Sequence, residues 1–343
     1  MTKKVLVLLS GGIDSTYAAY HLKEQGFFVK GLVLRIYDDI PTPNDLHNIE
    51  IIKNKIGFDV EIQDVRDEFR KRIINYFLST YKEGKTPNPC ARCNPEIKFY
   101  YAIKTLKEQH FNFVASGHYA DIGQYKGYLT LKTSSDKTKS QEYFLARIPQ
   151  DYLGQIIFPL AHVKKEFIKK EIQKLFPTLL SHKESQDVCF LKKEGVKEFL
   201  KRYHVEIKGK MVYKNTVVKE GIDILSYTRG QRRGIDFAAG HRVYVKDIDI
   251  TNRAIELGER KDLASSSFTI NSPIFYVPLN EIERCSVKVR YSKNAVPCQI
   301  KKIDEHKLRV VLKKPLFTIT EGQLAVFYDN EYVLGSGWID SIF

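Results

Sequence analysis

The sequence predicts an α/β protein, with a doubly wound parallel sheet in its first half, followed by two small β domains of which the last is a β-barrel. Three observations predict this architecture. Strand-like apolar runs alternate with helical patterns in the first half, and short strands with period-two alternation follow from about residue 205. A length of 343 residues with 43% hydrophobic content is sufficient for two or three domains with sizeable cores.

The first half alternates strand and helix. The expected strands cover residues 5–9, 28–34, 60–62 and 113–118, and the expected helices follow Thr16 or cover 49–56, 68–81 and about 97–109. Strands separated by helices form parallel sheets, and ligands of such sheets bind beyond the carboxyl ends of the strands. Ser10, Leu34 and Gly117 all fall at such ends.

The second half changes to short alternating strands broken by turns. The clearest candidates are residues 243–245, 254–257, 287–291, 308–312 and 324–328. Regular short strands are typical of small β domains and barrels. We therefore expect a catalytic domain over residues 1–204, a central β-rich domain over 205–263 and a C-terminal barrel over 264–343.

The most informative segment is Val5–Thr16, where an apolar strand meets Ser10-Gly11-Gly12-Ile13-Asp14-Ser15 and a helical pattern follows. Glycines let the backbone approach an oxyanion, and the N–H groups of the turn and of the helix start point at it. The ordinary P-loop carries a lysine after its glycine, but none follows Gly12 here. The alternative is a glycine-rich turn that binds no ligand.

Cys90 and Cys93 follow two prolines, Pro87 and Pro89, which exclude a helix or sheet interior and predict a rigid loop. Asn94-Pro95 then predicts a helix start, and a helix N-terminus near Arg92 and Lys98 favours a thiolate. Taken alone, Cys-x-x-Cys is a redox pair, half of a zinc site or an incidental pair, and no second pair completes a zinc site. Cys189 lies between apolar residues, so this residue taken alone is interpreted as a core residue.

The chain carries 55 Lys and Arg against 41 Asp and Glu, a net charge of +14, with basic pairs such as Arg232-Arg233. Nucleic acid is the natural partner of such a surface, although a solvated lysine-rich surface is the alternative. Five cysteines without a disulfide-like spacing, no cleavage site for a signal peptide and no membrane-length apolar stretch predict a cytoplasmic protein without a membrane partner.

The motifs together resemble the tRNA-specific 2-thiouridylases (MnmA), a family of PP-loop N-type ATP pyrophosphatases. The resemblance covers nearly the whole chain in the family's order, through the segments beginning at Ser10, Thr86, Ser116, Lys139, Ser185, Tyr227, Val287 and Glu321. It implies an enzyme that places sulfur at C2 of the wobble uridine of tRNA and splits ATP into AMP and pyrophosphate.

The resemblance also implies the site residues. The ATP site comprises Leu8, Leu9, Ser10, Gly11, Gly12, Ile13, Asp14, Ser15, Thr16, Leu34 and Gly117. The catalytic residues are Cys93, the nucleophile, and Cys189, which carries the incoming sulfur. The tRNA contacts are Asn88, Pro89, Cys90, His118, Lys139, Ser140, Gln141, Arg290, Tyr291 and Gln323. Further expectations are Mg²⁺ with the ATP, a sulfur-donor protein (a cysteine desulfurase or a relay) and a monomeric enzyme.

The implied sulfur chemistry has two forms. In the preferred form Cys189 carries a persulfide and Cys93 attacks its inner sulfur, which leaves a Cys93–Cys189 disulfide. In the alternative form Cys90, Cys93 and Cys189 hold a [4Fe-4S] cluster with one open iron. Cys90 stands where many family members have aspartate, which keeps this alternative open.

A second departure from the family is Ser140, where aspartate is usual, so we expect a charge to be missing beside the tRNA.

Two rival functions remain at this point. A PP-loop ligase or amidotransferase acting on a small molecule fits residues 10–16 equally well but leaves the cysteine motifs and β domains unexplained. An inactive tRNA-binding protein would not be expected to keep both cysteines and the complete loop.

Overall fold

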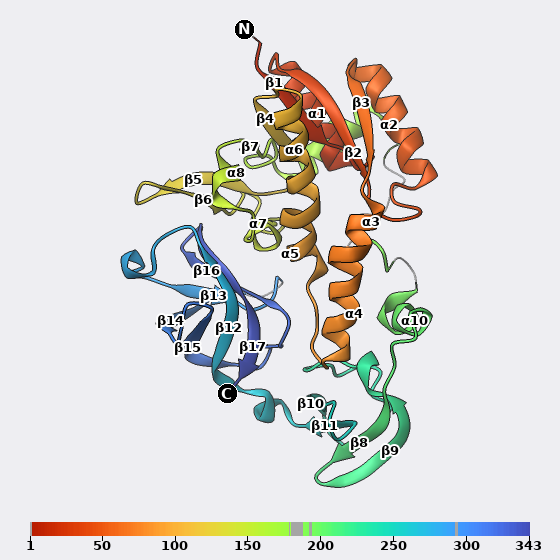
Figure 1. Ribbon diagram of the computed structural model, residues 1–343, viewed down its shortest axis with the longest axis vertical. Coiled ribbons are helices and arrows are strands. Elements are labelled where there is room, and N and C mark those ends of the chain that lie inside the picture. The colour runs from red at the N-terminus through yellow and green to blue at the C-terminus, as the bar shows by residue number, and fades with distance from the viewer. Residues whose placement is uncertain (1, 178, 180–187, 192–193, 292–293) are drawn as a thin grey trace. The chain divides into compact units, whose positions relative to one another are not determined.

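Figure 1 shows a computed structural model of the chain, which describes all residues except 1, 178, 180–187, 192–193 and 292–293. The chain forms two compact units. The first unit comprises Met1–Ile73, Cys90–Gln186 and Asn330–Leu334, and the second comprises Ile74–Pro89, Asp187–Asp329 and Gly335–Phe343. Each unit is therefore assembled from three separate stretches of the chain. The division into three domains at residues 205 and 264 stays a prediction.

The first unit contains a five-stranded sheet in the order β3-β2-β1-β4-β7, in which all neighbours are parallel. Its strands are β1 (Lys4–Leu8), β2 (Phe28–Arg35), β3 (Asp59–Asp64), β4 (Phe113–Ser116) and β7 (Ile156–Ile157). Val5, Leu6 and Val7 of the central strand are fully buried, as expected for a strand covered on both faces. The predicted parallel sheet is confirmed.

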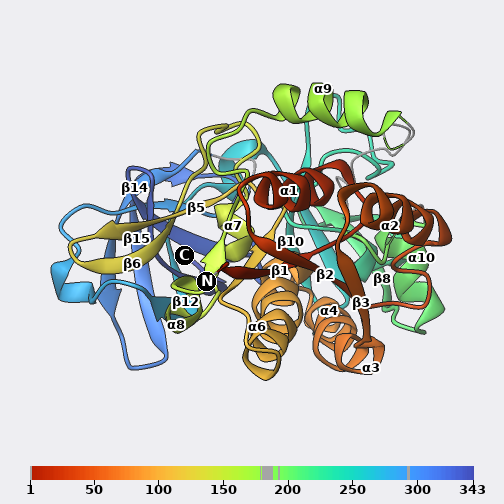
Figure 2. The ribbon, with the colours of Figure 1, turned by 90° about the horizontal axis from the view of Figure 1, so that it is seen from above.

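Helices cover both faces of this sheet: α1, α2 and α9 lie on one face and α6 on the other (Figure 2). The helices of the unit are α1 (Ile13–Glu24), α2 (Pro43–Ile56), α3 (Arg66–Phe69), α5 (Pro89–Cys93), α6 (Tyr100–Glu108), α7 (Glu142–Leu145), α8 (Gln150–Leu153) and α9 (Lys165–Leu175), with π-helical turns at Arg70–Ile74 and Asn94–Phe99. A hairpin of β5 (Asp121–Tyr125) and β6 (Tyr128–Lys132) follows β4. The core on the α1 face joins residues of β1, α1 and α9.

Helix α2 begins at Pro43, six residues before the predicted start. Its N-terminus is a capping box, in which Thr42 Oγ1 accepts the N–H of Asp45 at 3.1 Å and Asp45 accepts the N–H of Thr42 at 2.8 Å. Proline is compatible with the first helical position, where its missing N–H needs no partner. The helix ends at Gly57 as predicted, in a left-handed conformation (φ 76°).

The second unit contains a four-stranded sheet in the order β10-β11-β8-β9. Its strands are β8 (Lys208–Tyr213), β9 (Thr216–Asp223), β10 (Tyr244–Asp249) and β11 (Ala254–Gly258). Helices α4 (Asn75–Lys82) and α10 (Gly195–Arg202) and 3-10 turns at Ile224–Ser226, Arg260–Leu263 and Leu279–Glu281 belong to the same unit. Phe77 of α4 contacts Phe190 and Phe199 edge-on, at centroid distances of 5.2 and 5.5 Å, so α4 shares an aromatic core with α10.

The C-terminal part of the chain forms the predicted β-barrel. The strands are β12 (Ser265–Phe275), β13 (Ser286–Lys288), β14 (Val296–Lys302), β15 (Lys307–Leu316), β16 (Leu324–Asp329) and β17 (Tyr332–Ile342). They are ordered β12-β15-β14-β13-β16-β17, and β17 pairs with β12 to close the barrel. Phe268, Val310 and Phe327 are fully buried. Within the part of the chain that the structure describes, no helix has the length and apolar character needed to cross a membrane.

Candidate active site

The loop between β1 and α1 forms a cradle of backbone amides. Gly11 has a φ of +76°, and a Cβ at this position would lie 2.8 Å from the carbonyl oxygen of Asp45, so only glycine fits without displacement. Gly12 is the N-cap of α1 and has no side chain to cap the helix. The N-terminus of α1 is therefore not capped by a side chain, and such a helix start attracts anionic groups. Binding of ATP at this loop stays a prediction.

Hydrogen bonds fix the shape of this cradle. Ser15 Oγ donates to the carbonyl oxygen of Gly12 at 3.0 Å and accepts the N–H of Ser10 at 3.2 Å. Thr16 Oγ1 donates to the same carbonyl at 2.9 Å. The hydroxyl groups of the motif thus stabilise the turn itself, in addition to any contact with a ligand.

The neighbouring strand ends complete the edge of the sheet at which the cradle lies. Leu8 pairs with Leu32 of β2 and with Ser116 of β4, so the carboxyl ends of the three strands are adjacent. Gly117 packs directly against the start of α1, because a Cβ there would lie 2.6 Å from the N atom of Ser15. Leu34 lies near the end of β2 and is buried. The predicted ATP-site residues of these strands therefore share one edge.

The two cysteines of the Cys-x-x-Cys motif lie on a helix, so the prediction of a loop is wrong. Helix α5 (Pro89–Cys93) continues into the π-helical turn Asn94–Phe99 and then into α6. Pro89 occupies the first position of α5, where proline causes no loss of a hydrogen bond. Cys93 is only 6% exposed.

Two further expectations about this motif are corrected. Asn94 does not cap a helix; its side-chain amide donates to the carbonyl oxygen of Phe144 at 3.0 Å. Arg92 Nε lies 2.8 Å from Glu96 Oε1, so a carboxylate one turn along the helix offsets the positive charge expected to act on the thiols.

The segment before these cysteines is held by Gln323 within the second unit. The amide of Gln323 donates to the carbonyl oxygens of Thr86 at 3.1 Å and Pro87 at 3.0 Å, and its oxygen lies 3.5 Å from the side-chain amide of Asn88. The N–H of Thr86 donates in turn to the carbonyl oxygen of Glu321 at 2.9 Å. Gln323, predicted to contact tRNA, thus positions the residues that lead into α5.

Cys189 is exposed and lies in a turn in which the N–H of Leu191 donates to the carbonyl oxygen of Val188 at 3.0 Å. The next residue, Phe190, is buried in the aromatic core of the second unit. The interpretation of Cys189 as a core residue is therefore wrong, because its neighbour Phe190 is the residue that packs in the core. Residues 184–187 of the same motif lie outside the described residues.

His118 lies just beyond β4, where its Nδ1 is 2.9 Å from Ser116 Oγ. Burial, with a smaller contribution from the charge of Lys98, lowers the pKa of His118 to about 3. The ring is therefore neutral at physiological pH, and it can stack or exchange a hydrogen bond but cannot form an ion pair with phosphate.

Comparison with known proteins identifies the family. Residues 3–193 match the tRNA methyl transferase HUP domain, and residues 265–339 match the aminomethyltransferase beta-barrel domain. The tRNA-specific 2-thiouridylase MnmA of Campylobacter lari is 34% identical over 350 residues, which cover 98% of this chain and 100% of the relative. The chain belongs to the MnmA family of tRNA-specific 2-thiouridylases. The MnmA proteins of Nitratiruptor sp. and Clostridioides difficile are 34% and 32% identical, with 99% of this chain and 100% and 99% of the relatives covered.

The segment from Lys139 to Gln141 lies within the first unit. Gln141 Oε1 accepts the N–H of Tyr119 at 3.0 Å. Ser140 is buried, and its hydroxyl donates to Glu142 Oε2 at 2.6 Å. Position 140 therefore supplies a buried hydroxyl that binds the carboxyl group of Glu142 and lies away from the surface.

Arg290 has its hydrogen-bond partners inside the second unit. Its guanidinium donates to the carbonyl oxygen of Arg229 at 3.2 Å and to Thr320 Oγ1. It therefore ties the segment before β10 to the barrel. Tyr291, the next residue, is 39% exposed.

One residue beside the loop between β1 and α1 was not predicted to lie there. Lys165 is 2% exposed, and its Nζ lies 2.7 Å from both carboxylate oxygens of Asp14. From the sequence, Lys164 and Lys165 form a basic surface cluster. The signal that could have distinguished them is the position of Lys165 on the apolar face of a helix, three residues before Ile168.

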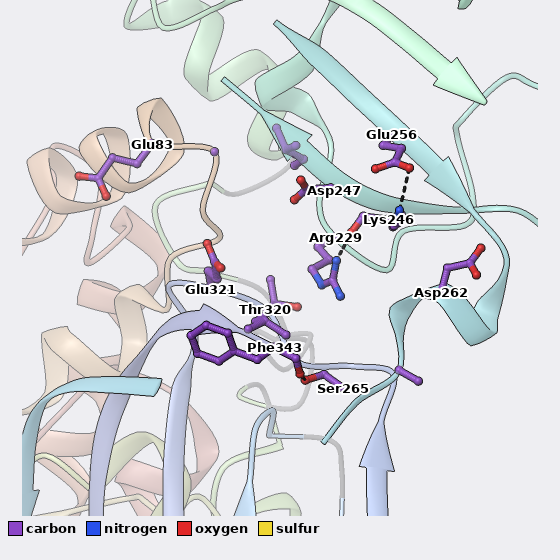
Figure 3. A pocket seen from close by; sticks show the side chains of 14 residues that line it. Glu83, Arg229, Lys246, Asp247, Glu256, Asp262, Ser265, Thr320, Glu321 and Phe343 are labelled. Atoms are coloured by element: carbon purple, nitrogen blue, oxygen red, sulfur yellow. Dashed lines mark hydrogen bonds and ion pairs between the residues drawn. The ribbon is translucent and has the colours of Figure 1, made fainter. Parts of the chain in front are cut away.

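A pocket of about 470 Å³ in the second unit contains none of the predicted site residues (Figure 3). Several of its polar groups already have partners within the protein. Lys246 and Glu256 form an ion pair of 2.7 Å, and Arg229 donates to the carbonyl oxygen of Lys246. Burial raises the pKa of Glu321 at the same pocket. Among the residues that the structure describes, no group of three or more His, Cys, Asp or Glu side chains is arranged to hold a metal ion.

Proposed function

We propose that this chain uses ATP to transfer sulfur to C2 of the wobble uridine of tRNA. The observation that carries the proposal is the open amide cradle of residues 10–15 in a chain that is similar over 98–99% of its length to curated 2-thiouridylases. The cradle suits the phosphates of ATP, and the basic net charge of +14 suits a tRNA substrate.

The first step activates the base. The C2 oxygen of uracil is a poor leaving group, so its attack on the α-phosphorus of ATP, with release of pyrophosphate, converts it into the better leaving group AMP. Gly11, Gly12 and the start of α1 would bind the phosphates, and Leu34 would pack near the adenine. Mg²⁺ bound with ATP would be held by phosphate oxygens and would offset phosphate charge.

The second step transfers sulfur. The terminal sulfur of a Cys189 persulfide attacks C2 and expels AMP, which joins Cys189 to the base through two sulfur atoms. The Cys93 thiolate then attacks the Cys189 sulfur and releases 2-thiouridine, leaving a Cys93–Cys189 disulfide that a thiol reductant must reduce before the next cycle.

The surroundings of the two thiols support this division of roles. Cys189 is exposed in a turn, where a sulfur-donor protein such as a cysteine desulfurase can reach it. Cys93 is buried, so competing oxidants have poor access to it. The two residues belong to different compact units, and the mechanism requires their Cα atoms to come within about 7 Å when bridged.

An iron–sulfur route through Cys90, Cys93 and Cys189 is the second candidate. Cys90 and Cys93 share the short helix α5, which supports their acting as a pair. No three-residue ligand group is assembled among the described residues, so no step is derived through a cluster. Iron and sulfide in the purified, anaerobically prepared protein would favour this route, and thiolation by iron-free protein with a cysteine desulfurase would exclude it.

The decisive test measures AMP, pyrophosphate and 2-thiouridine in the monomeric fraction of the full-length protein, with and without tRNA. We expect AMP and pyrophosphate only when tRNA is present. Cys93→Ser and Cys189→Ser should each abolish thiolation while tRNA still binds, and Cys285→Ser in the barrel should not. Thiolation retained by either active-site variant would contradict the assigned roles, and ATP cleavage without tRNA would favour a small-molecule ligase.

A further inference from the structure

A buried lysine lies against the carboxylate of the phosphate-binding loop. Nζ of Lys165, the first residue of α9, is 2.7 Å from both Oδ1 and Oδ2 of Asp14, the second residue of α1. The hydroxyl of Tyr119 donates to Oδ1 of the same carboxylate at 2.8 Å. The pair is therefore bidentate and further supported by a hydrogen bond.

The fold fixes the position of this lysine. Ile168 and Ile172 of α9 belong to the same buried cluster as Ala18 and Leu22 of α1, so the two helices are packed together. The N–H of Lys165 donates to Asp136 Oδ2 at 3.2 Å, which anchors the start of α9. The ammonium group is thus directed to Asp14 by packing on one side and by a hydrogen bond on the other.

Stability alone does not account for the pair. The Lys165 side chain is only 3% exposed, whereas that of Asp14 is 32% exposed. Removing a charged lysine from water is costly, and an apolar side chain of similar volume at such a position is often as stable or more so. A buried lysine that pairs with a carboxylate next to a ligand cradle is therefore a candidate for a functional role. The sequence of the loop indicates which role, since no lysine follows Gly12.

An unopposed carboxylate at position 14 would weaken the cradle. The glycine turn and the N-terminus of α1 attract phosphate through backbone amides and partial positive charge. A full negative charge within the first turn of that helix would repel the same phosphates, because two like charges a few ångströms apart interact strongly where water is partly excluded.

We propose that Lys165 is the charge partner of the loop: it cancels the charge of Asp14 and fixes its carboxylate, so that the cradle accepts triphosphate and pyrophosphate. Lys165 is a positioning residue in this role, because it acts through Asp14. The inference rests on the proposed ATP-dependent reaction and adds to it a residue about 150 positions away along the chain.

The test measures binding of inorganic pyrophosphate to the full chain by calorimetry, without magnesium and without tRNA. The variants are Lys165→Met, Asp14→Asn and the double variant, with Lys170→Met as the control because Lys170 is exposed on the same helix. We expect Lys165→Met to weaken binding at least tenfold and Lys170→Met to leave it unchanged. The double variant should bind within about threefold of the wild type, and Asp14→Asn at least as tightly as the wild type.

The order of affinities separates charge from packing. If Lys165→Met binds pyrophosphate as tightly as the wild type, or if the double variant is as weak as Lys165→Met, the inference is overturned. Should Lys165→Met fail to fold, Asp14→Asn and the double variant decide. With Asp14 already neutral, removing Lys165 must leave pyrophosphate binding within about threefold of the wild type, and a tenfold loss in the double variant would overturn the inference. A wild-type protein that binds neither pyrophosphate nor ATP would instead contradict the proposed reaction.

Discussion

His118 shows at the scale of one residue how burial limits the chemistry of a side chain that is predicted to contact tRNA. The ring is held beside Ser116 and near the ring of Phe99, at a centroid distance of 6.0 Å. With a pKa of about 3 it carries no charge at neutral pH. Any contribution to tRNA binding therefore comes from stacking or hydrogen bonding, and it should depend little on salt.

The same shift makes the stability of the protein depend on pH. Below its ordinary pKa of about 6.5 the histidine takes up a proton in the unfolded chain but not in the folded one, so stability decreases as the pH falls from 6.5 toward 3. We expect the free energy of unfolding to fall by about 2 kcal/mol more in the wild type than in His118→Gln between pH 7.5 and pH 5. Denaturant unfolding at several pH values measures it. His306→Gln, at an exposed position, is the control; equal slopes for wild type and His118→Gln would contradict the prediction.

Residue identities alone predicted the backbone geometry of the loop between β1 and α1 but not all of the side chains that surround it. Gly11 and Gly117 were predictable because close backbone approach leaves a recognisable pattern of glycines at strand ends. Lys165 was not, since its partner Asp14 lies far away in sequence and a lysine pair usually marks an exposed surface. The exposure of Cys189 was also not predictable, because it depends on Phe190, and not Cys189, packing in the aromatic core.

At the scale of elements, helix α5 shows why two prolines did not produce a loop. Proline excludes a helix interior, but Pro89 opens the helix, and its fixed φ suits that position. Pro95 falls in a π-helical turn, Asn94–Phe99, where the regular ladder of hydrogen bonds is already altered. Proline does disfavour a helix interior, as assumed. The error was to expect the helix to begin after the two cysteines, whereas it begins at Pro89.

The contact of Gln323 with the segment from Thr86 to Asn88 gives a prediction at this scale. Gln323→Leu keeps most of the side-chain volume but removes the hydrogen bonds to the carbonyl oxygens of Thr86 and Pro87. Each such bond contributes about 1 kcal/mol net, so local opening should become about tenfold to a hundredfold more frequent. Hydrogen–deuterium exchange of residues 85–90 in the absence of tRNA measures this change.

The control for this experiment is Gln299→Leu, at an exposed position of β14. It should leave the exchange of residues 85–90 unchanged. If Gln323→Leu also leaves it unchanged, the hydrogen bonds do not hold the segment. Thiolation lost without faster exchange would indicate that Gln323 acts on tRNA alone.

At the scale of the whole molecule, the excess of positive charge predicts salt-dependent binding of tRNA. The logarithm of the binding constant falls as the logarithm of the salt concentration rises, and each phosphate contact that is lost makes this dependence shallower by about one unit of slope. Arg232 and Arg233 are adjacent and exposed, so Arg232→Met/Arg233→Met should lower the slope by between about one and two. Filter binding at several salt concentrations measures the slope.

A matched pair of substitutions separates local contacts from net charge. Lys104→Met/Lys107→Met removes the same charge from the exposed side of α6 and should leave the slope unchanged. An equal decrease in both double variants would mean that total charge alone governs binding. No decrease in either would contradict a phosphate contact at Arg232 and Arg233.

The order of the sheets and the barrel was predictable, since strand periodicity and helix spacing are local properties of the sequence. The grouping of the chain into units was not. Helix α4 follows α3 closely in sequence, but it joins the second unit because Phe77 packs with Phe190 and Phe199, more than 100 positions further on. No local pattern carries information about such partners.

The interleaving of the two units has a consequence for biosynthesis. The first unit includes Asn330–Leu334, where Glu331 accepts the N–H of Thr133 and Tyr332 pairs with Lys132 of β6. On the ribosome, the hairpin that ends at Lys132 therefore emerges about 200 residues before the strand that covers it. During that interval one edge of β6 has no neighbouring strand and can pair with other chains. Early binding of a chaperone, or rapid translation of the remaining message, would therefore increase the yield of folded protein.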